Sequence, residues 1–122
     1  MCEKHVTSVD ESETLEFDWG RIRWLANRAR VPGANITVGW VEIEPGMKNP
    51  LHLHPNSEEV LVLMEGELDH SIGEEVHRLT RGSAILVPQN TPHDGRNVGD
   101  VTARMLVSYP TGDRQMVVLE ES

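Results

Sequence analysis

The feature that most constrains the fold of this chain is its series of short apolar runs, each ended by glycine or proline. Ten glycines and seven prolines divide the 122 residues at sites such as Pro45-Gly46 and Pro110-Thr111-Gly112. Short strand-like runs between such turns are typical of antiparallel barrels and sandwiches. No segment keeps the 3.6-residue period of an amphipathic helix. We therefore predict an all-β, small antiparallel barrel, and the length suits a single domain with one core.

The boundaries of the expected elements follow from the same pattern. Residues 1–14 are polar and acidic, and we expect a tail or a peripheral strand there, with the barrel formed by residues 15–122. The expected strands are Arg21–Ala26, Ile36–Ile43, His52–His54, Val60–Met64, Leu68–Ile72, Val76–Leu79, Ala84–Val87, Val101–Tyr109 and Gln115–Glu120.

Three histidines and a glutamate form a second pattern. His52 and His54 are two residues apart, which puts both side chains on one face of a strand. A turn then brings Glu59 level with them on the neighbouring strand, and His93 arrives from a later one. Neutral imidazoles with one carboxylate suit a transition metal. We predict that these four residues bind one divalent ion per chain (Fe, Mn, Ni, Cu, Co or Zn); the alternative is a metal-free barrel in which they only hydrogen-bond.

The residues around these donors resemble the two motifs of the cupin superfamily. Gly46–Gly66 reads Gly, five residues, His-x-His, four residues, Glu, six residues, Gly, a register that selects Glu59 as the ligand and turns Glu58 away. Gly82–Asn97 reads Gly, five residues, Pro-x-Asn, two residues, His, three residues, Asn. The one departure is Asn90, which stands where the family has glycine. Since asparagine tolerates positive φ best after glycine, we expect Asn90 to form the same turn.

The resemblance implies a jelly-roll barrel with the metal inside. Alternation along the strand then points Leu61 and Leu63 inward with Glu59, as an apolar floor beneath the metal. The alternate residues of Val60–Met64 face the other way and are also apolar. Because both faces of this strand need cover, we predict a homodimer.

Composition excludes several classes of protein. A net charge of −9 argues against nucleic acid as a partner, and two lysines cannot form a polybasic membrane patch. No apolar run has the length of a membrane span, and the N-terminus has no signal-peptide core. Cys2 is the single cysteine, expected to be an incidental surface thiol. Together these features predict a cytoplasmic protein with no membrane partner.

Beyond the four donors, His70 and Tyr109 are candidates for catalytic roles. His70 lies on the Leu68–Ile72 strand, either as a proton shuttle near the site or as a satisfied core or interface residue. Tyr109, with Trp24 and Trp40, either lines the mouth of the pocket or belongs to the core.

Arginines outnumber lysines nine to two, and one that reached into the barrel would bind a substrate carboxylate. Arg23, Arg96 and Arg104 lie in or beside expected strands, and Arg104 is a further catalytic candidate. A surface ion pair with one of the twenty acidic residues is the alternative for each of them.

Three imidazoles and a carboxylate leave one or two positions open on an octahedral ion, as a catalytic metal needs. Cupins with this donor set include oxalate-processing enzymes, dioxygenases and small lyases. We therefore expect an enzyme that acts on a small anionic or enolisable molecule, of dioxygenase type. The alternatives are a non-redox lyase, cyclase or isomerase, and a non-catalytic module that binds or senses a small ligand.

Overall fold

The computed structural model describes residues 5–120. Cys2 therefore lies outside the described residues. The elements are β1 (Thr14–Phe17), β2 (Gly20–Ala26), β3 (Thr37–Ile43), β4 (His52–Leu53), β5 (Glu59–Glu65), β6 (Leu68–Ile72), β7 (Glu75–Leu79), β8 (Ala84–Val87), β9 (Gly95–Asn97), β10 (Ala103–Tyr109) and β11 (Val117–Val118), with a short 3₁₀ turn, η1 (Val9–Glu11).

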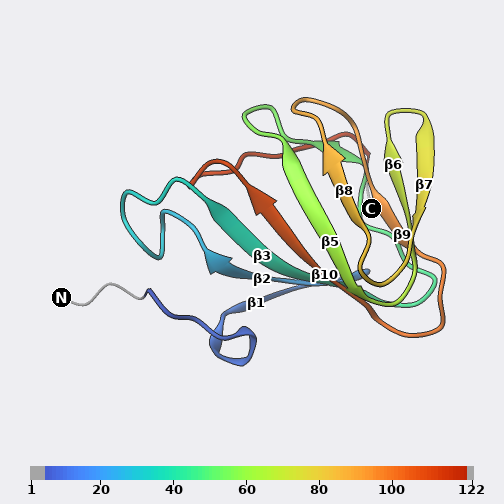
Figure 1. Ribbon diagram of the computed structural model, residues 1–122, viewed down its shortest axis with the longest axis horizontal. Helices are drawn as coiled ribbons and strands as arrows, with labels where there is room; N and C mark the ends of the chain where they lie inside the picture. Colours follow the sequence, from blue (N-terminus) through green and yellow to red (C-terminus); the bar gives the residue numbers. More distant parts are fainter. Residues whose placement is uncertain (1–4, 121–122) are drawn as a thin grey trace.

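The fold is an antiparallel jelly roll, as the sequence predicts. One wall is a six-stranded sheet in the order β1-β2-β3-β10-β5-β8 (Figure 1). The second wall combines the β7-β6-β9 and β11-β4 sheets, which are joined by isolated bridges between His52 and His93 and between Lys48 and Arg96. Among the described residues, no helix has the length and hydrophobicity needed to span a bilayer.

Strict alternation of buried and less buried residues puts the core between the walls. In β3 and β10, every second side chain is buried. In β5, Leu61 and Leu63 point inward with Glu59, whereas Val60 and Val62 are only half-buried and Met64 is exposed. The predicted inward face of this strand is therefore confirmed.

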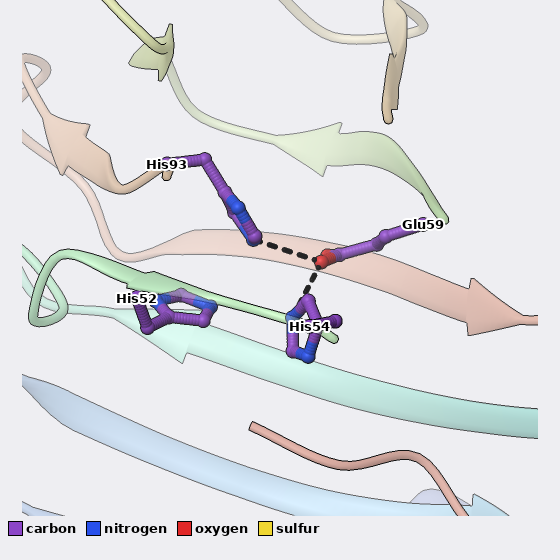
Figure 2. Close-up of side chains that lie close together, drawn as sticks. All are labelled: His52, His54, Glu59 and His93. Carbon is purple, nitrogen blue, oxygen red and sulfur yellow. Dashed lines mark hydrogen bonds and ion pairs between the residues drawn. The ribbon is translucent and has the colours of Figure 1, made fainter. Parts of the chain in front are cut away.

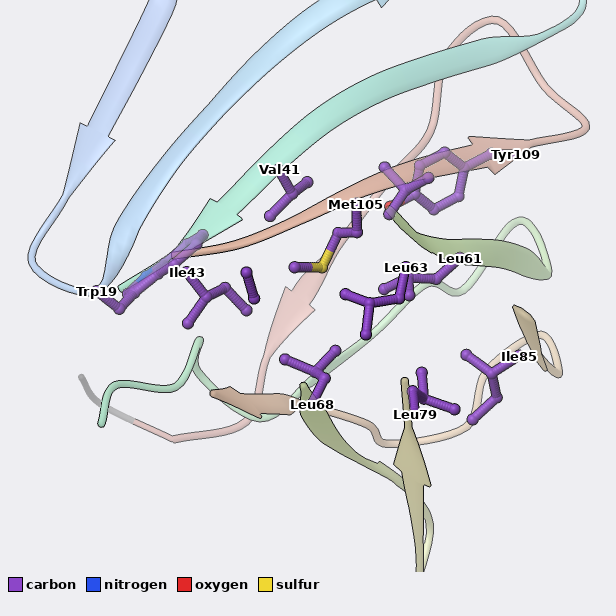
Figure 3. Packing of buried hydrophobic residues seen from close by; sticks show 12 residues of the cluster. Trp19, Val41, Ile43, Leu61, Leu63, Leu68, Leu79, Ile85, Met105 and Tyr109 are labelled. Atoms are coloured by element: carbon purple, nitrogen blue, oxygen red, sulfur yellow. The ribbon is translucent and has the colours of Figure 1, made fainter. Parts of the chain in front are cut away.

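The apolar cluster packs between the two walls of the barrel (Figure 3). Leu63, Leu68, Ile43 and Met105 are fully buried in it, and they come from four different strands. Such packing across both walls holds the donor-bearing strands at fixed spacing, because a dense core resists displacement.

Three differences from the expected elements have physical causes. The hairpin strand β1 was missed because Thr14–Phe17 is short and largely exposed. The strand β9 was missed because Gly95–Asn97 carries no apolar pattern. The expected strand Gln115–Glu120 pairs only at Val117–Val118. The end of that segment is held by the Glu120 carboxylate, which accepts from Lys48 and from Leu51 N, and not by strand pairing.

Candidate metal centre

The four donors come from three separate segments of the chain. His52 lies on β4 and His54 directly after it, and Glu59 opens β5. His93 follows the turn at Asn90, whose φ of 63° confirms the left-handed conformation expected there. The backbones of His52 and His93 exchange two hydrogen bonds, of 3.1 Å and 2.8 Å between N and O. This pairing fixes the two histidines opposite each other.

The structure brings all four predicted donors together (Figure 2). Each offers one ligand atom, and these atoms all lie within 4.8 Å of one another. Glu59 Oε1 lies 3.1 Å from Nε2 of both His54 and His93. All four side chains are buried, whereas the neighbouring Glu58 is exposed, as predicted.

Backbone carbonyls determine which ring nitrogen faces the centre. Nδ1 of His52 lies 2.7 Å from Pro50 O, and Nδ1 of His54 lies 2.8 Å from Gln115 O. Nδ1 of His93 lies 2.9 Å from Thr91 O. A carbonyl oxygen only accepts, so each Nδ1 must carry the hydrogen, which leaves the Nε2 lone pair for a ligand.

With this tautomer, the four side chains cannot stabilise one another by hydrogen bonds alone. His54 Nε2 is buried and has no hydrogen-bond partner of acceptable geometry, although it is close to the Glu59 carboxylate. An unprotonated Nε2 and a carboxylate repel each other unless a cation or a proton lies between them. Three such nitrogens around one carboxylate therefore fit a divalent ion.

The pKa shifts of three of the donors, His52, Glu59 and His93, agree with this assignment. Burial lowers the pKa of His52 to about 4, and the charge of His93 adds to the effect. Burial would raise the pKa of Glu59, but the neighbouring imidazoles of His54 and His93 hold that pKa well below its usual range. Burial would likewise lower the pKa of His93, but the Glu59 hydrogen bond and charge outweigh it and raise that pKa.

The donors open into a cavity of about 630 Å³ between the two walls. His70 lines it, with its ring stacked on His93 at 5.8 Å between centroids and its Nδ1 3.0 Å from Ser71 O. Burial lowers the pKa of His70. Tyr109 lines it too, 5.0 Å from the His54 ring, and burial and then the charge of Glu59 raise the pKa of its phenol well above the usual value.

The other residues singled out by sequence are divided between cavity and surface. Trp24 lines the cavity, whereas the Trp40 indole donates to Glu42 at 3.0 Å. Arg23 donates to Val9 O at 2.8 Å. Arg104 forms ion pairs with Glu42 and Glu65, at 3.3 Å and 2.7 Å, and is not among the residues that line the cavity.

The arginine that does line the cavity, Arg114, was missed by sequence reasoning. It lies in the segment between β10 and β11, outside every expected strand. Its position depends on the His54–Gln115 hydrogen bond, on the bond that Asn56 Nδ2 donates to Asp113 O, and on the bond that Gln115 N donates to Asn56 Oδ1. No local sequence pattern predicts these contacts.

Comparison with known proteins agrees with the fold and the donor set. The model of the Cupin domain family matches residues 39–109. The chain therefore belongs to the cupin family, and its four clustered donors fit a metal-binding cupin.

Three known proteins are similar to this chain. "Polyketide synthase CurC" of Streptomyces cyaneus is 32% identical over 101 residues, which are 83% of this chain and 66% of that protein. Oxalate oxidase GF-2.8 of Triticum aestivum is 35% identical over 92 residues, 66% of this chain and 41% of the relative. A structure of Bacillus subtilis oxalate decarboxylase, from work on its Mn(II) centres, superposes with a TM-score of 0.85 at 23% identity. That match covers 91% of this chain and 31% of the decarboxylase. The chain thus spans less than two thirds of each relative's length.

Proposed function

We propose that this protein is a metal-dependent enzyme that acts on an anionic or enolisable organic molecule at an ion held by His52, His54, Glu59 and His93. The observation that carries the proposal is the set of three Nδ1–H to carbonyl hydrogen bonds, which leave three Nε2 lone pairs around one carboxylate. The neighbouring cavity supplies room for a substrate beside the ion.

A divalent ion in this donor set supplies a Lewis acid of local charge near +1 and, when it is redox-active, a centre for dioxygen chemistry. The one carboxylate among four ligands favours an anionic partner at the remaining positions. The relatives named as an oxalate oxidase and an oxalate decarboxylase with Mn(II) centres are consistent with this preference.

The chain's own residues supply positioning and exclusion of water. Ile43, Leu61 and Met105 line the apolar side of the cavity, so a bound molecule loses its hydration near the donors. The Tyr109 phenol stays protonated at neutral pH and offers a hydrogen-bond donor at the edge of the site. His70 adds an imidazole whose Nδ1 is occupied by Ser71 O.

We propose the dioxygenase type as the reaction class, with Fe, Mn, Ni, Cu or Co as the ion. A non-redox cyclase, lyase or isomerase using Zn is the second candidate. A cavity with mostly apolar walls and the similarity to a protein named polyketide synthase favour that second candidate.

Oxygen uptake and product analysis would separate the two classes. Purified protein, prepared without a metal-chelating tag, would be assayed against a panel of carboxylates, enols and phenols. Oxygen uptake that matches product formation supports the dioxygenase, and turnover without oxygen uptake supports the second class. Ligand binding with no turnover of any panel member, in protein with full metal content, would contradict the enzyme proposal. Glu59→Gln is the control, because it removes the anionic ligand and should reduce turnover.

A further inference from the structure

The cavity beside the four donors is lined differently from the donor cluster. Its wall is largely apolar, with aromatic rings from three strands and the adjoining turn. These rings are Phe17, Trp19, Trp24 and Tyr109. Phe17 and Trp19 are stacked, with ring centroids 5.0 Å apart and planes 5° from parallel. A wall of this kind binds planar apolar groups by burial and ring contacts.

One permanent positive charge lies on this wall. The guanidinium carbon of Arg114 lies 4.5 Å from the centre of the Trp24 ring and 5.4 Å from that of Tyr109. Its Nε is buried and has no hydrogen-bond partner. In the part of the chain that the structure describes, no carboxylate forms an ion pair with Arg114, unlike Arg21 or Arg104. A guanidinium that packs against two aromatic rings and donates no hydrogen bond is preorganised to bind an anion.

The position of Arg114 is coupled to the metal centre. The Tyr109 ring contacts the Arg114 guanidinium and also lies 5.0 Å from the His54 ring. The next residue after Arg114, Gln115, accepts the hydrogen bond from His54 Nδ1 at 2.8 Å. Arg114 therefore lies about one aromatic ring away from a metal ligand, a separation that a single planar molecule can span.

We propose that Arg114 binds the anionic group of an organic substrate whose planar, apolar body fills the cavity and whose other end reaches the four donors. This inference rests on the proposed function for the placement of the reacting end, and it names the substrate class as an aromatic or conjugated anion. A small dianion such as oxalate would leave most of the 630 Å³ and its apolar wall without contacts.

The test uses binding rather than turnover. Protein loaded with Zn²⁺ would be titrated by calorimetry with 2-naphthoate, with its uncharged isostere 2-naphthamide, and with acetate. We expect naphthoate to bind roughly tenfold to a hundredfold more tightly than naphthamide, as a charge-assisted hydrogen-bonded pair provides. Acetate should bind at least roughly tenfold more weakly than naphthoate, because it has no apolar body to bury. Equal affinity for acetate and naphthoate would overturn the substrate class.

Arg114→Met should remove the preference for the acid while leaving naphthamide binding within about twofold, since methionine keeps an apolar contact with Trp24. Circular dichroism and metal content should match the wild type. The matched control is Arg28→Met, because Arg28 lines a second hollow that also includes Arg114 but not the donors. Arg28→Met should keep the full preference for naphthoate over naphthamide. Loss of that preference in Arg28→Met would place the anion in the second hollow and overturn the proposal.

His52→Ala distinguishes this inference from the proposed function. If the preference for naphthoate survives Arg114→Met and disappears in His52→Ala, the anion binds at the metal, which overturns the role of Arg114 and leaves the metal centre standing. If the protein retains no metal, the proposed function fails, while the effect of Arg114→Met on the preference is still measured. Loss of the preference in Arg114→Met, with unchanged metal content, supports the inference.

Discussion

Replacement of His52 by leucine should reduce the acid sensitivity of the metal-free protein. Burial lowers the pKa of His52 to about 4, from an ordinary value of 6.5. Because the unfolded chain binds this proton first, the neutral ring stabilises the fold fully above pH 6.5, and that contribution is lost as the pH falls toward 4. At roughly 1.4 kcal/mol for each pH unit, and less near each end where one of the two states is only partly protonated, the loss between pH 6.5 and 4.5 is about 2 kcal/mol.

Other groups of the site do not mask this effect in the chosen window. The raised pKa of His93 gives a contribution to folding stability that is fully present below pH 6.5. The lowered pKa of Glu59 gives a contribution to folding stability that is fully present above pH 4.5. His70, whose pKa is also lowered, adds a loss of the same sign as His52. The wild type should therefore lose at least as much stability as His52 alone predicts.

Urea unfolding of chelator-treated protein at pH 6.5 and 4.5, followed by circular dichroism, measures the two free energies. His52→Leu should lose about 2 kcal/mol less than the wild type between these two pH values. His77→Leu is the matched control, because His77 is 47% exposed on β7. This substitution should leave the loss of unfolding free energy between the two pH values unchanged. An equal acid-induced loss in His52→Leu and wild type would refute the assignment of His52 as a buried neutral ligand.

Three further expectations follow from the site and its surroundings. Zn²⁺ binding near neutral pH should release protons, because Glu59 raises the pKa of His93 and a bound metal needs the neutral imidazole; calorimetry in buffers of different ionisation enthalpy measures the release, and zero release would contradict the raised pKa of His93. Gly39→Ala should destabilise the fold by about 1 to 3 kcal/mol in urea unfolding, since the new Cβ would lie 2.6 Å from the Trp24 ring; unchanged stability would show that this ring moves freely. The homodimer stays a prediction, motivated by the half-buried outer face of β5, and a mass by light scattering that is monomeric at all concentrations would refute it.

The metal centre could be predicted from sequence because its geometry depends on short-range rules. The i, i+2 spacing of His52 and His54, and the alternation that buries Glu59, follow from strand geometry. His93 needed the second motif, since no local rule places it opposite His52. Asn90 could be assigned to a left-handed turn because few other residues tolerate that conformation.

The anionic-ligand site could not be predicted in this way. Arg114 reaches the cavity through a segment held by hydrogen bonds to Asn56 and His54, sixty residues earlier in the sequence. The local sequence around Arg114 has neither alternation nor a motif to distinguish it from Arg104, which the structure places in surface ion pairs. Side-chain contacts between distant segments decided which arginine entered the cavity.

The metal content of the purified protein tests the central claim most directly. Elemental analysis by mass spectrometry of tag-free wild type and His52→Ala, with circular dichroism on the same samples, gives ions per folded chain. The four-donor centre predicts close to one transition-metal ion per chain in the wild type and loss of most of it in His52→Ala, with the β signal retained because the apolar core cluster includes none of the four donors. Full occupancy in folded His52→Ala, or a wild type that holds no ion after exposure to each candidate metal, would contradict the account.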